Sequence, residues 1–163
     1  MEHNNEIKAV IERVKIQFKK FYNGDPWATE NFNQKVLSIK QDEALRKIQG
    51  HSHSVAELVR HMIAWRNFAV QKLTGNDSYD IEDESTVNWP EPTDWADTCK
   101  EFELCHQNLL SAIETLPLER WNATVPGRNY SFIYLVHGII EHDYYHYGQI
   151  GSLMAGIRKM QAM

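Results

Sequence analysis

The chain has 163 residues, of which 42% are hydrophobic and 24% are charged, and its formal net charge is −5. This composition is typical of a soluble globular protein, so we expect a single domain over residues 1–163. No segment approaches the ~18 apolar residues of a membrane span, the N-terminus has no apolar signal core, and no basic block favours a nucleic-acid partner.

Four long segments place apolar residues at helical spacing, and strand-like alternation fits them poorly. We expect an all-α fold, a four-helix bundle whose long helices cover about residues 4–23, 54–75, 94–116 and 131–158. The first helix ends at Asn23-Gly24, a stop signal that Pro26 follows. Residues 25–52 carry two short helical patterns, and we expect this stretch to wrap across the bundle as a connection between helices one and two.

The second helix has the clearest limits, because Ser54 and Glu57 form a capping box at its start and Gly75 stops it. The segment that follows, residues 75–92, is polar and acidic, so we expect a solvated loop rather than a cation site. Its acidic residues are Asp77, Asp80, Glu82, Asp83, Glu84 and Glu91.

The third helix is capped by Thr93 or Asp94, and its apolar stripe alternates steps of four and three without a break. Cys99 and Cys105 lie six residues apart on this helix and face different sides, which argues against an internal disulfide. A reducing cytoplasm is therefore the expected location. We also expect a homodimer, because this helix carries apolar residues beyond its stripe, including Leu104, Cys105 and Leu110.

His142 and His146 are the most informative residues, because a spacing of four stacks two imidazoles on one face of helix four. Steps of four and three place both rings within one apolar stripe, formed by Leu135, Ile139, His142, His146, Ile150, Leu153 and Ile157. Such a pair has the geometry of a metal chelate. The alternative is two core histidines that only make hydrogen bonds.

A third ligand must come from another helix, and His61 is the leading candidate. It lies between Leu58 and Trp65 on the core edge of helix two, and in a bundle that face can meet helix four. Three histidines with open positions make a catalytic type of metal site rather than a closed structural one. His106, on the stripe of helix three, is the rival, although a buried histidine is the simpler interpretation. His137 is out of phase with the pair and cannot share its metal.

Several neighbours have two interpretations each. Gln149 lies on the same face as the pair and could orient a ligand, touch substrate or cap a backbone carbonyl. Trp65, one turn after His61, is a core residue or, as the alternative, the wall of a substrate pocket. Glu57 could be a general base, but the capping box already explains it. The remaining histidines are expected to be solvated: His3, His51 and His53.

Three segments resemble the DinB-like (YfiT) superfamily of bacterial four-helix proteins, some of which are metal-dependent. That family's second helix, with its single ligand histidine, is similar to HSHSVAELVRHMIAWRNFAVQKLTG, and its closing helix, with paired ligand histidines, resembles EHDYYHYGQI. The loop after the first helix of close relatives resembles YNGDPW. The resemblance implies His61, His142 and His146 as a metal triad.

The resemblance also implies a function. Characterised relatives use a divalent metal to activate a low-molecular-weight thiol such as bacillithiol or mycothiol, and others have been labelled hydrolases. We therefore expect a metal-dependent enzyme that acts on a small molecule, with Zn, Ni or Fe as its cofactor and activated water as the alternative nucleophile. Cys99 and Cys105 lie outside the matched motifs, so neither need be the catalytic thiol. The rival hypothesis is a non-catalytic, dimeric stress-response module that binds metal.

Overall fold

The fold is all-helical in the computed structural model, which describes residues 2–27, 30–36, 38–81, 86–92 and 94–162. Its elements, in chain order, are α1 (Glu2–Tyr22), α2 (Phe32–Val36), α3 (Gln41–Ala44), α4 (Val55–Leu73), α5 (Trp95–Thr115), the 3-10 turn η1 (Leu118–Arg120) and α6 (Phe132–Gln161). These residues contain no strand, and an isolated bridge pairs Thr124 with Ser131. The prediction of an all-α fold is confirmed. None of these helices is both long and apolar enough to cross a membrane.

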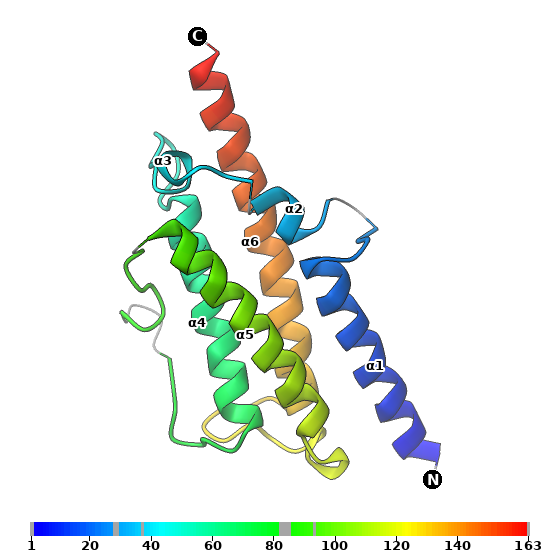
Figure 1. The fold of residues 1–163 in the computed structure, drawn as a ribbon. Coiled ribbons are helices and arrows are strands. Elements are labelled where there is room, and N and C mark those ends of the chain that lie inside the picture. Colours follow the sequence, from blue (N-terminus) through cyan, green and yellow to red (C-terminus); the bar gives the residue numbers. More distant parts are fainter. Residues whose placement is uncertain (1, 28–29, 37, 82–85, 93, 163) are drawn as a thin grey trace.

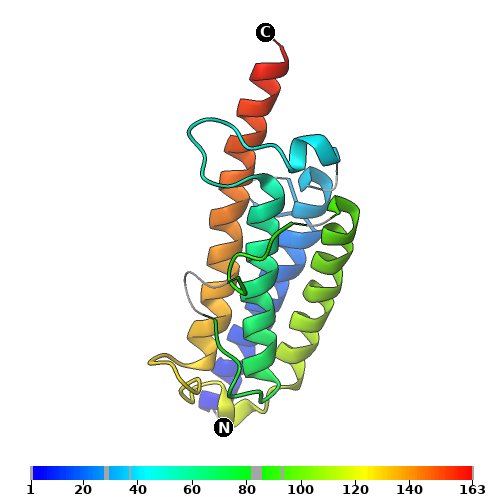
Figure 2. The same ribbon diagram turned by 90° about the vertical axis from the view of Figure 1, so that its left-hand side faces the viewer.

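Four long helices, α1, α4, α5 and α6, lie side by side (Figure 1, Figure 2). α4 makes its most extensive contacts with α5 and α6, and α1 packs against the same two helices. α6 is the longest and extends beyond the other three at its C-terminal end (Figure 1). The pairing of α4 with α6 matters most for function, because these two helices carry the histidines that the sequence predicts as metal ligands.

The connection from α1 to α4 contains the two short helices α2 and α3, as the sequence predicts for this stretch. Hydrogen bonds tie it to the long helices. The indole Nε1 of Trp95 donates to the carbonyl of Ile39 at 2.9 Å, and the hydroxyl of Tyr147 donates to the carbonyl of Glu30 at 2.6 Å. The connection is therefore fastened to both α5 and α6.

Side-chain caps begin three of the long helices. Ser54 Oγ accepts from the amide of Glu57 at 3.2 Å, while Glu57 Oε2 accepts from the amide of Ser54 at 2.7 Å, which completes the predicted capping box. The carboxylate of Asp94 accepts from two amides in the first turn of α5, and Ser131 caps α6. Thr93, the alternative cap, lies outside the described residues. α4 and α5 thus begin at the residue after a predicted cap, and α6 begins directly after Ser131, where its start was expected.

The segment between α4 and α5 differs from the solvated loop that its acidic composition predicts. Asp77, Asp80 and Glu91 are exposed, while Glu82, Asp83 and Glu84 lie outside the described residues. Ile81 and Asn88 are buried, however, with exposed fractions of 4% and 3%. The described parts of this segment run along the outside of α4 (Figure 2). The loop is therefore placed to contribute to a site on that helix.

The apolar residues predicted outside the α5 stripe do not share one surface. Leu104 is exposed, Leu110 is half-buried, and Cys105 is buried within the chain. Cys105 therefore cannot contribute to the surface on which the expected homodimer would rest. Both cysteines are free thiols.

Candidate metal centre

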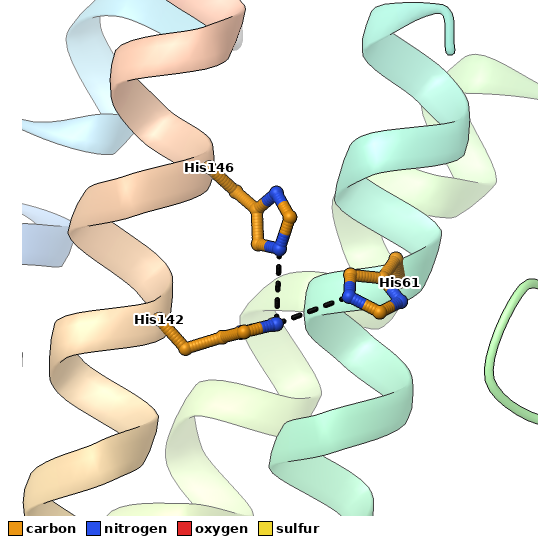
Figure 3. Close-up of side chains that lie close together, drawn as sticks. All are labelled: His61, His142 and His146. Carbon is orange, nitrogen blue, oxygen red and sulfur yellow. Dashed lines mark hydrogen bonds between the residues drawn. The ribbon is translucent and has the colours of Figure 1, made fainter. Parts of the chain in front are cut away.

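His61 from α4 and His142 and His146 from α6 point their rings toward one another between the two helices (Figure 3). Nε2 of His142 lies 3.0 Å from Nε2 of His61 and 2.9 Å from Nε2 of His146. One ligand atom from each ring lies within 4.8 Å of the others, and such a group could hold a metal ion. His61 and His146 are buried, while His142 is half-buried. We call these three residues the triad.

Two rings of the triad have their outer nitrogen fixed by an acceptor. Nδ1 of His61 donates to the backbone carbonyl of Asn88 at 2.9 Å. Nδ1 of His146 donates to Oε1 of Gln149 at 2.6 Å, and the amide of Gln149 in turn donates to the hydroxyl of Tyr145 at 3.1 Å. Because each acceptor requires its hydrogen on Nδ1, a neutral ring keeps a bare lone pair on Nε2. Both lone pairs are directed at His142.

The three Nε2 atoms cannot satisfy one another. A neutral imidazole carries one hydrogen, so His142 can donate well to only one of its two neighbours. Its Nδ1 is buried and makes no hydrogen bond within the described part of the chain. At least one Nε2 lone pair is therefore left facing another nitrogen at about 3 Å. A cation among these atoms would bind all three lone pairs, so the donor set fits a divalent metal that prefers imidazole.

The three histidines of the triad have lowered pKa values, which favours metal binding because a metal competes with protons for the ring nitrogens. Burial is the largest cause, and it lowers the pKa of His61 from 6.5 to about 4 and that of His142 to about 3, with repulsion from neighbouring histidines acting in the same direction. Burial also lowers the pKa of His146, although its hydrogen bond to Gln149 opposes this. All three rings are neutral at pH 7, which is the form that binds metal.

An aromatic stack lies against His61. The ring of Trp89 is nearly parallel to that of His61, with centroids 3.9 Å apart and an angle of 10°, and the ring of His53 lies 3.8 Å from Trp89 at 9°. Asn88 also accepts from Nε1 of Trp65 at 2.9 Å through its side chain. The prediction that His53 is solvated is wrong, because Trp89 from the acidic segment covers its ring.

A buried ion pair joins α4 to α6 next to the triad. Arg66 and Asp143 both have side chains that are 0% exposed, and Nε and Nη2 of Arg66 donate to Oδ2 of Asp143 at 3.0 and 2.7 Å. The guanidinium also lies 4.3 Å from the ring centroid of Phe102. Burial raises the pKa of Asp143, and the charge of Arg66 opposes that rise. We call this pair the Arg66–Asp143 clasp.

The other candidate residues lie outside the triad. His106 is buried, stacks on Tyr22 with centroids 4.4 Å apart, and accepts from Nη1 of Arg66 at 3.3 Å. Burial and the charge of Arg66 lower its pKa to about 3, so it is a neutral core histidine. His137 is half-buried and does not belong to the group of possible ligands found among the described residues. Glu57 is engaged by the capping box, which is its structural role.

Two pockets open beside the triad. The His146 pocket has a volume of about 500 Å³, and its walls include His51, His53, Trp89, His146 and Gln149. The His142 pocket has a volume of about 270 Å³, and its walls include Trp65, Tyr130, Tyr134 and His142. Trp65 therefore walls a pocket, and Gln149 both orients a triad ring and lines a pocket. His51 was expected to be solvated, but it is half-buried.

Two charged residues next to the triad, Arg66 and Asp143, were not predicted, although their positions in the sequence indicate burial. Arg66 falls within an apolar stripe of α4, with Met62, Ala69 and Leu73. Asp143 falls within a second apolar stripe of α6, with Val136, Ile140 and Tyr147. Opposite charges at core positions of two packed helices predict a buried pair. Asn88 left no such signal, because it reaches His61 from a loop 27 residues away.

Comparison with known proteins identifies a family. The model of a family described as the DinB superfamily matches residues 27–150, which is more than half of the chain and includes the whole triad. The searches of curated proteins and of solved structures found no match. The resemblance to this family is therefore confirmed, and the two segments that carry the triad lie within the match, whereas YNGDPW lies at its edge.

Proposed function

Because the chain belongs to the DinB superfamily, we propose that it is a metal-dependent enzyme that activates a low-molecular-weight thiol for transfer to an electrophile. The proposed ligands are His61, His142 and His146. The observation that carries the proposal is the convergence of three neutral imidazole Nε2 atoms, two of them on rings whose other nitrogen is already held by an acceptor. Zn, Ni or Fe suits such a donor set.

The surroundings of the triad support a catalytic rather than a structural site. Structural zinc sites are closed by a fourth protein ligand, whereas the group found among the described residues contains three. Asn88 and Gln149 hold ligand rings in place, as the outer partners of metal ligands do in enzymes. Two pockets also reach the triad, one lined by His146 and the other by His142, so a substrate has a place to bind.

The chain's own cysteines are unsuited to be the nucleophile. Burial raises the pKa of Cys99 to about 11 and that of Cys105 to about 12, so both thiols stay protonated at neutral pH. Cys105 packs against α4, where its Sγ lies 3.9 Å from the carbonyl of Ile63. These observations favour a thiol supplied from solution.

In the proposed reaction a thiol and an electrophile give a thioether. The sulfur forms a bond to the electrophilic carbon, the leaving group departs with the electron pair of the broken bond, and the thiol proton passes to solvent. A divalent cation, when bound, lowers the pKa of a coordinated thiol so that its sulfur is anionic near neutral pH. Asn88 and Gln149 keep the ligand rings oriented, while the pockets hold the two reactants close together.

The proposal is tested with Zn-loaded protein, a panel of bacillithiol, mycothiol, glutathione and cysteine, and 1-chloro-2,4-dinitrobenzene as the electrophile. We expect thioether formation whose rate rises with pH along a titration well below the ordinary thiol pKa of about 8.5. The rate vanishes with a chelator and in His146→Ala. His106→Ala is the matched control, because it removes a buried histidine outside the triad and retains the rate.

Two other outcomes would replace the proposal. If no thiol reacts but the Zn-loaded protein hydrolyses esters with the same histidine dependence, water takes the place of the thiol. If metal binds and neither reaction is detected, the alternative of a non-catalytic metal-binding module is favoured.

A further inference from the structure

We propose that the two pockets beside the triad hold different reactants, with the thiol in the His146 pocket and an apolar electrophile in the His142 pocket. The assignment rests on the proposed function, which requires two reactants at one centre. The pockets share no lining residue in the part of the chain that the structure describes, and each is lined by a different histidine of α6. The Nε2 atoms of those histidines lie 2.9 Å apart. Reactants in the two pockets therefore meet at the triad.

The His146 pocket suits a polar thiol. Hydrogen-bonding side chains enter it from two directions, with Ser52 and His53 from the segment before α4, and Tyr145, Gln149 and Ser152 from α6. No Asp, Glu, Lys or Arg lines it in the described part of the chain, so no carboxylate there repels an anionic ligand. Its volume of about 500 Å³ lies within the range of roughly 300–1,000 Å³ of pockets that enclose whole small molecules.

The His142 pocket suits a flat, apolar electrophile. Among the described residues its walls are aromatic and aliphatic apart from His142 and the tyrosine hydroxyls, and they include Trp65, Tyr130, Tyr134, Leu135 and Ile139. The indole nitrogen of Trp65 already donates to Asn88. An apolar or aromatic ligand gains by leaving water for such walls. The volume of about 270 Å³ also restricts this pocket to a smaller ligand.

The opposite assignment is disfavoured by the polar groups of the ligand. A thiol whose sulfur is surrounded by hydroxyl, amide or carboxylate groups would leave most of them without partners among the aromatic walls. In the His146 pocket the same groups face serine, histidine and glutamine side chains. Because the walls of the two pockets differ in polarity, each pocket favours a different reactant.

Three positions on α6 allow a matched test, because a leucine can be introduced at each. Gly138 lines the His142 pocket, and a Cβ there would meet no atom within 4 Å. Ser152 lines the His146 pocket and is exposed. Gly148 lines neither pocket, is exposed, and also has no atom within 4 Å of an added Cβ. Leucine forms helix better than glycine or serine, so Gly138→Leu, Ser152→Leu and Gly148→Leu should all fold.

Binding is measured by calorimetry on the Zn-loaded variants, separately for each reactant, so that no turnover is needed. The thiol probes are bacillithiol, mycothiol, glutathione and cysteine, and the electrophile probe is 1,3-dinitrobenzene, which lacks a chloride leaving group. We expect Ser152→Leu to weaken thiol binding by about tenfold or more and to leave dinitrobenzene unaffected. Gly138→Leu should do the reverse, and Gly148→Leu should change neither.

The two-pocket assignment is overturned if both leucines weaken the same ligand, if neither has an effect, if their effects are exchanged, or if no thiol binds the wild-type protein. A failure of the proposed function looks different. In that case thiol and dinitrobenzene bind at separate pockets as predicted, yet 1-chloro-2,4-dinitrobenzene is not converted to a thioether.

Discussion

The triad and the Arg66–Asp143 clasp are two buried polar clusters on the same pair of helices, α4 and α6. They differ in whether the chain itself supplies partners for their polar atoms. In the clasp a guanidinium donates to a carboxylate, so each buried charge has its partner within the chain. In the triad three imidazoles direct Nε2 atoms at one another, and a neutral set of rings cannot satisfy all of them. The clasp is complete by itself, whereas we propose that a cation completes the triad.

The exposed fraction does not distinguish His61, a proposed metal ligand, from His106, a core histidine. His61 is 6% exposed and His106 is 5% exposed, and burial lowers the pKa of both. The difference lies in the direction of the nitrogen that carries no hydrogen. In His106 that nitrogen faces Arg66, a donor, whereas in His61 it faces the other two histidines. The partner of the bare nitrogen therefore identifies a candidate metal ligand.

The largest expected effect comes from breaking the clasp on one side. Arg66→Met leaves the carboxylate of Asp143 buried without its partner and should lower the free energy of unfolding by about 3–5 kcal/mol. The double variant Arg66→Met/Asp143→Leu should recover most of that loss. Urea denaturation measures both.

The control for the clasp is Arg60→Met on the same helix, because Arg60 pairs with a partly exposed Glu101. Loss of such a pair should lower stability by only about 0–1 kcal/mol. An Arg66→Met variant as stable as Arg60→Met would show that the clasp does not hold a buried charge.

Breaking the triad should act on metal affinity. His61→Ala removes one of three proposed ligands, and we expect Zn affinity to fall by more than the roughly 100-fold (about 2.7 kcal/mol) that loss of an outer partner costs. His106→Ala removes an equally buried histidine and should leave Zn affinity nearly unchanged. Competition with a chromophoric chelator gives both values, and the reverse pattern would mean that the third ligand is His106.

A smaller effect is expected from Gln149, which orients a ring without being a proposed ligand. Gln149→Ala removes the acceptor at Nδ1 of His146 and should weaken Zn binding by roughly 10–100-fold. Gln161→Ala is the control, because that amide lies on the same helix but bonds to Glu43. Equal Zn affinities for the two variants would show that Gln149 does not support metal binding by His146.

The smallest expected effect is on the pH dependence of stability, and it concerns His106, which accepts a hydrogen bond from Arg66. In the unfolded chain His106 takes up a proton as the pH falls through about 6.5, whereas in the folded protein its pKa is about 3. The unfolded state therefore binds more protons in this window, and stability falls as the pH falls.

His106→Gln retains an acceptor for Arg66 but cannot titrate. It should reduce the slope of unfolding free energy against pH by at most about 1.4 kcal/mol per unit. Urea midpoints at several pH values between these limits measure the slope, and an unchanged slope would contradict the prediction.

The sequence predicts much of the fold and of the triad because these rest on local periodicity. The spacing of His142 and His146, the stripe around His61 and the capping box at Ser54 are each determined by neighbours a few residues away. Such patterns identify helices and the faces that they bury, which is enough to suggest that three histidines meet.

The residues that complete the site depend on contacts between distant segments. Asn88 and Trp89 belong to an acidic loop whose composition predicts only solvation, and nothing near them in the sequence indicates that they contact His61. Arg66 and Asp143 could have been paired from their positions within apolar stripes. The sequence alone did not specify which of the long helices would bring a partner to each charge.

The separation of the ligands along the chain gives a bound cation an effect on folding. His61 and His142 are 81 residues apart, so an ion held by both fastens two remote parts of the polypeptide together, and the unfolded chain offers no such arrangement. An ion present at a free concentration of 100 times its dissociation constant would add about 2.7 kcal/mol to the free energy of unfolding. The melting temperature should then rise with free-metal concentration, and a series of thermal melts in metal buffers would yield the dissociation constant without any substrate.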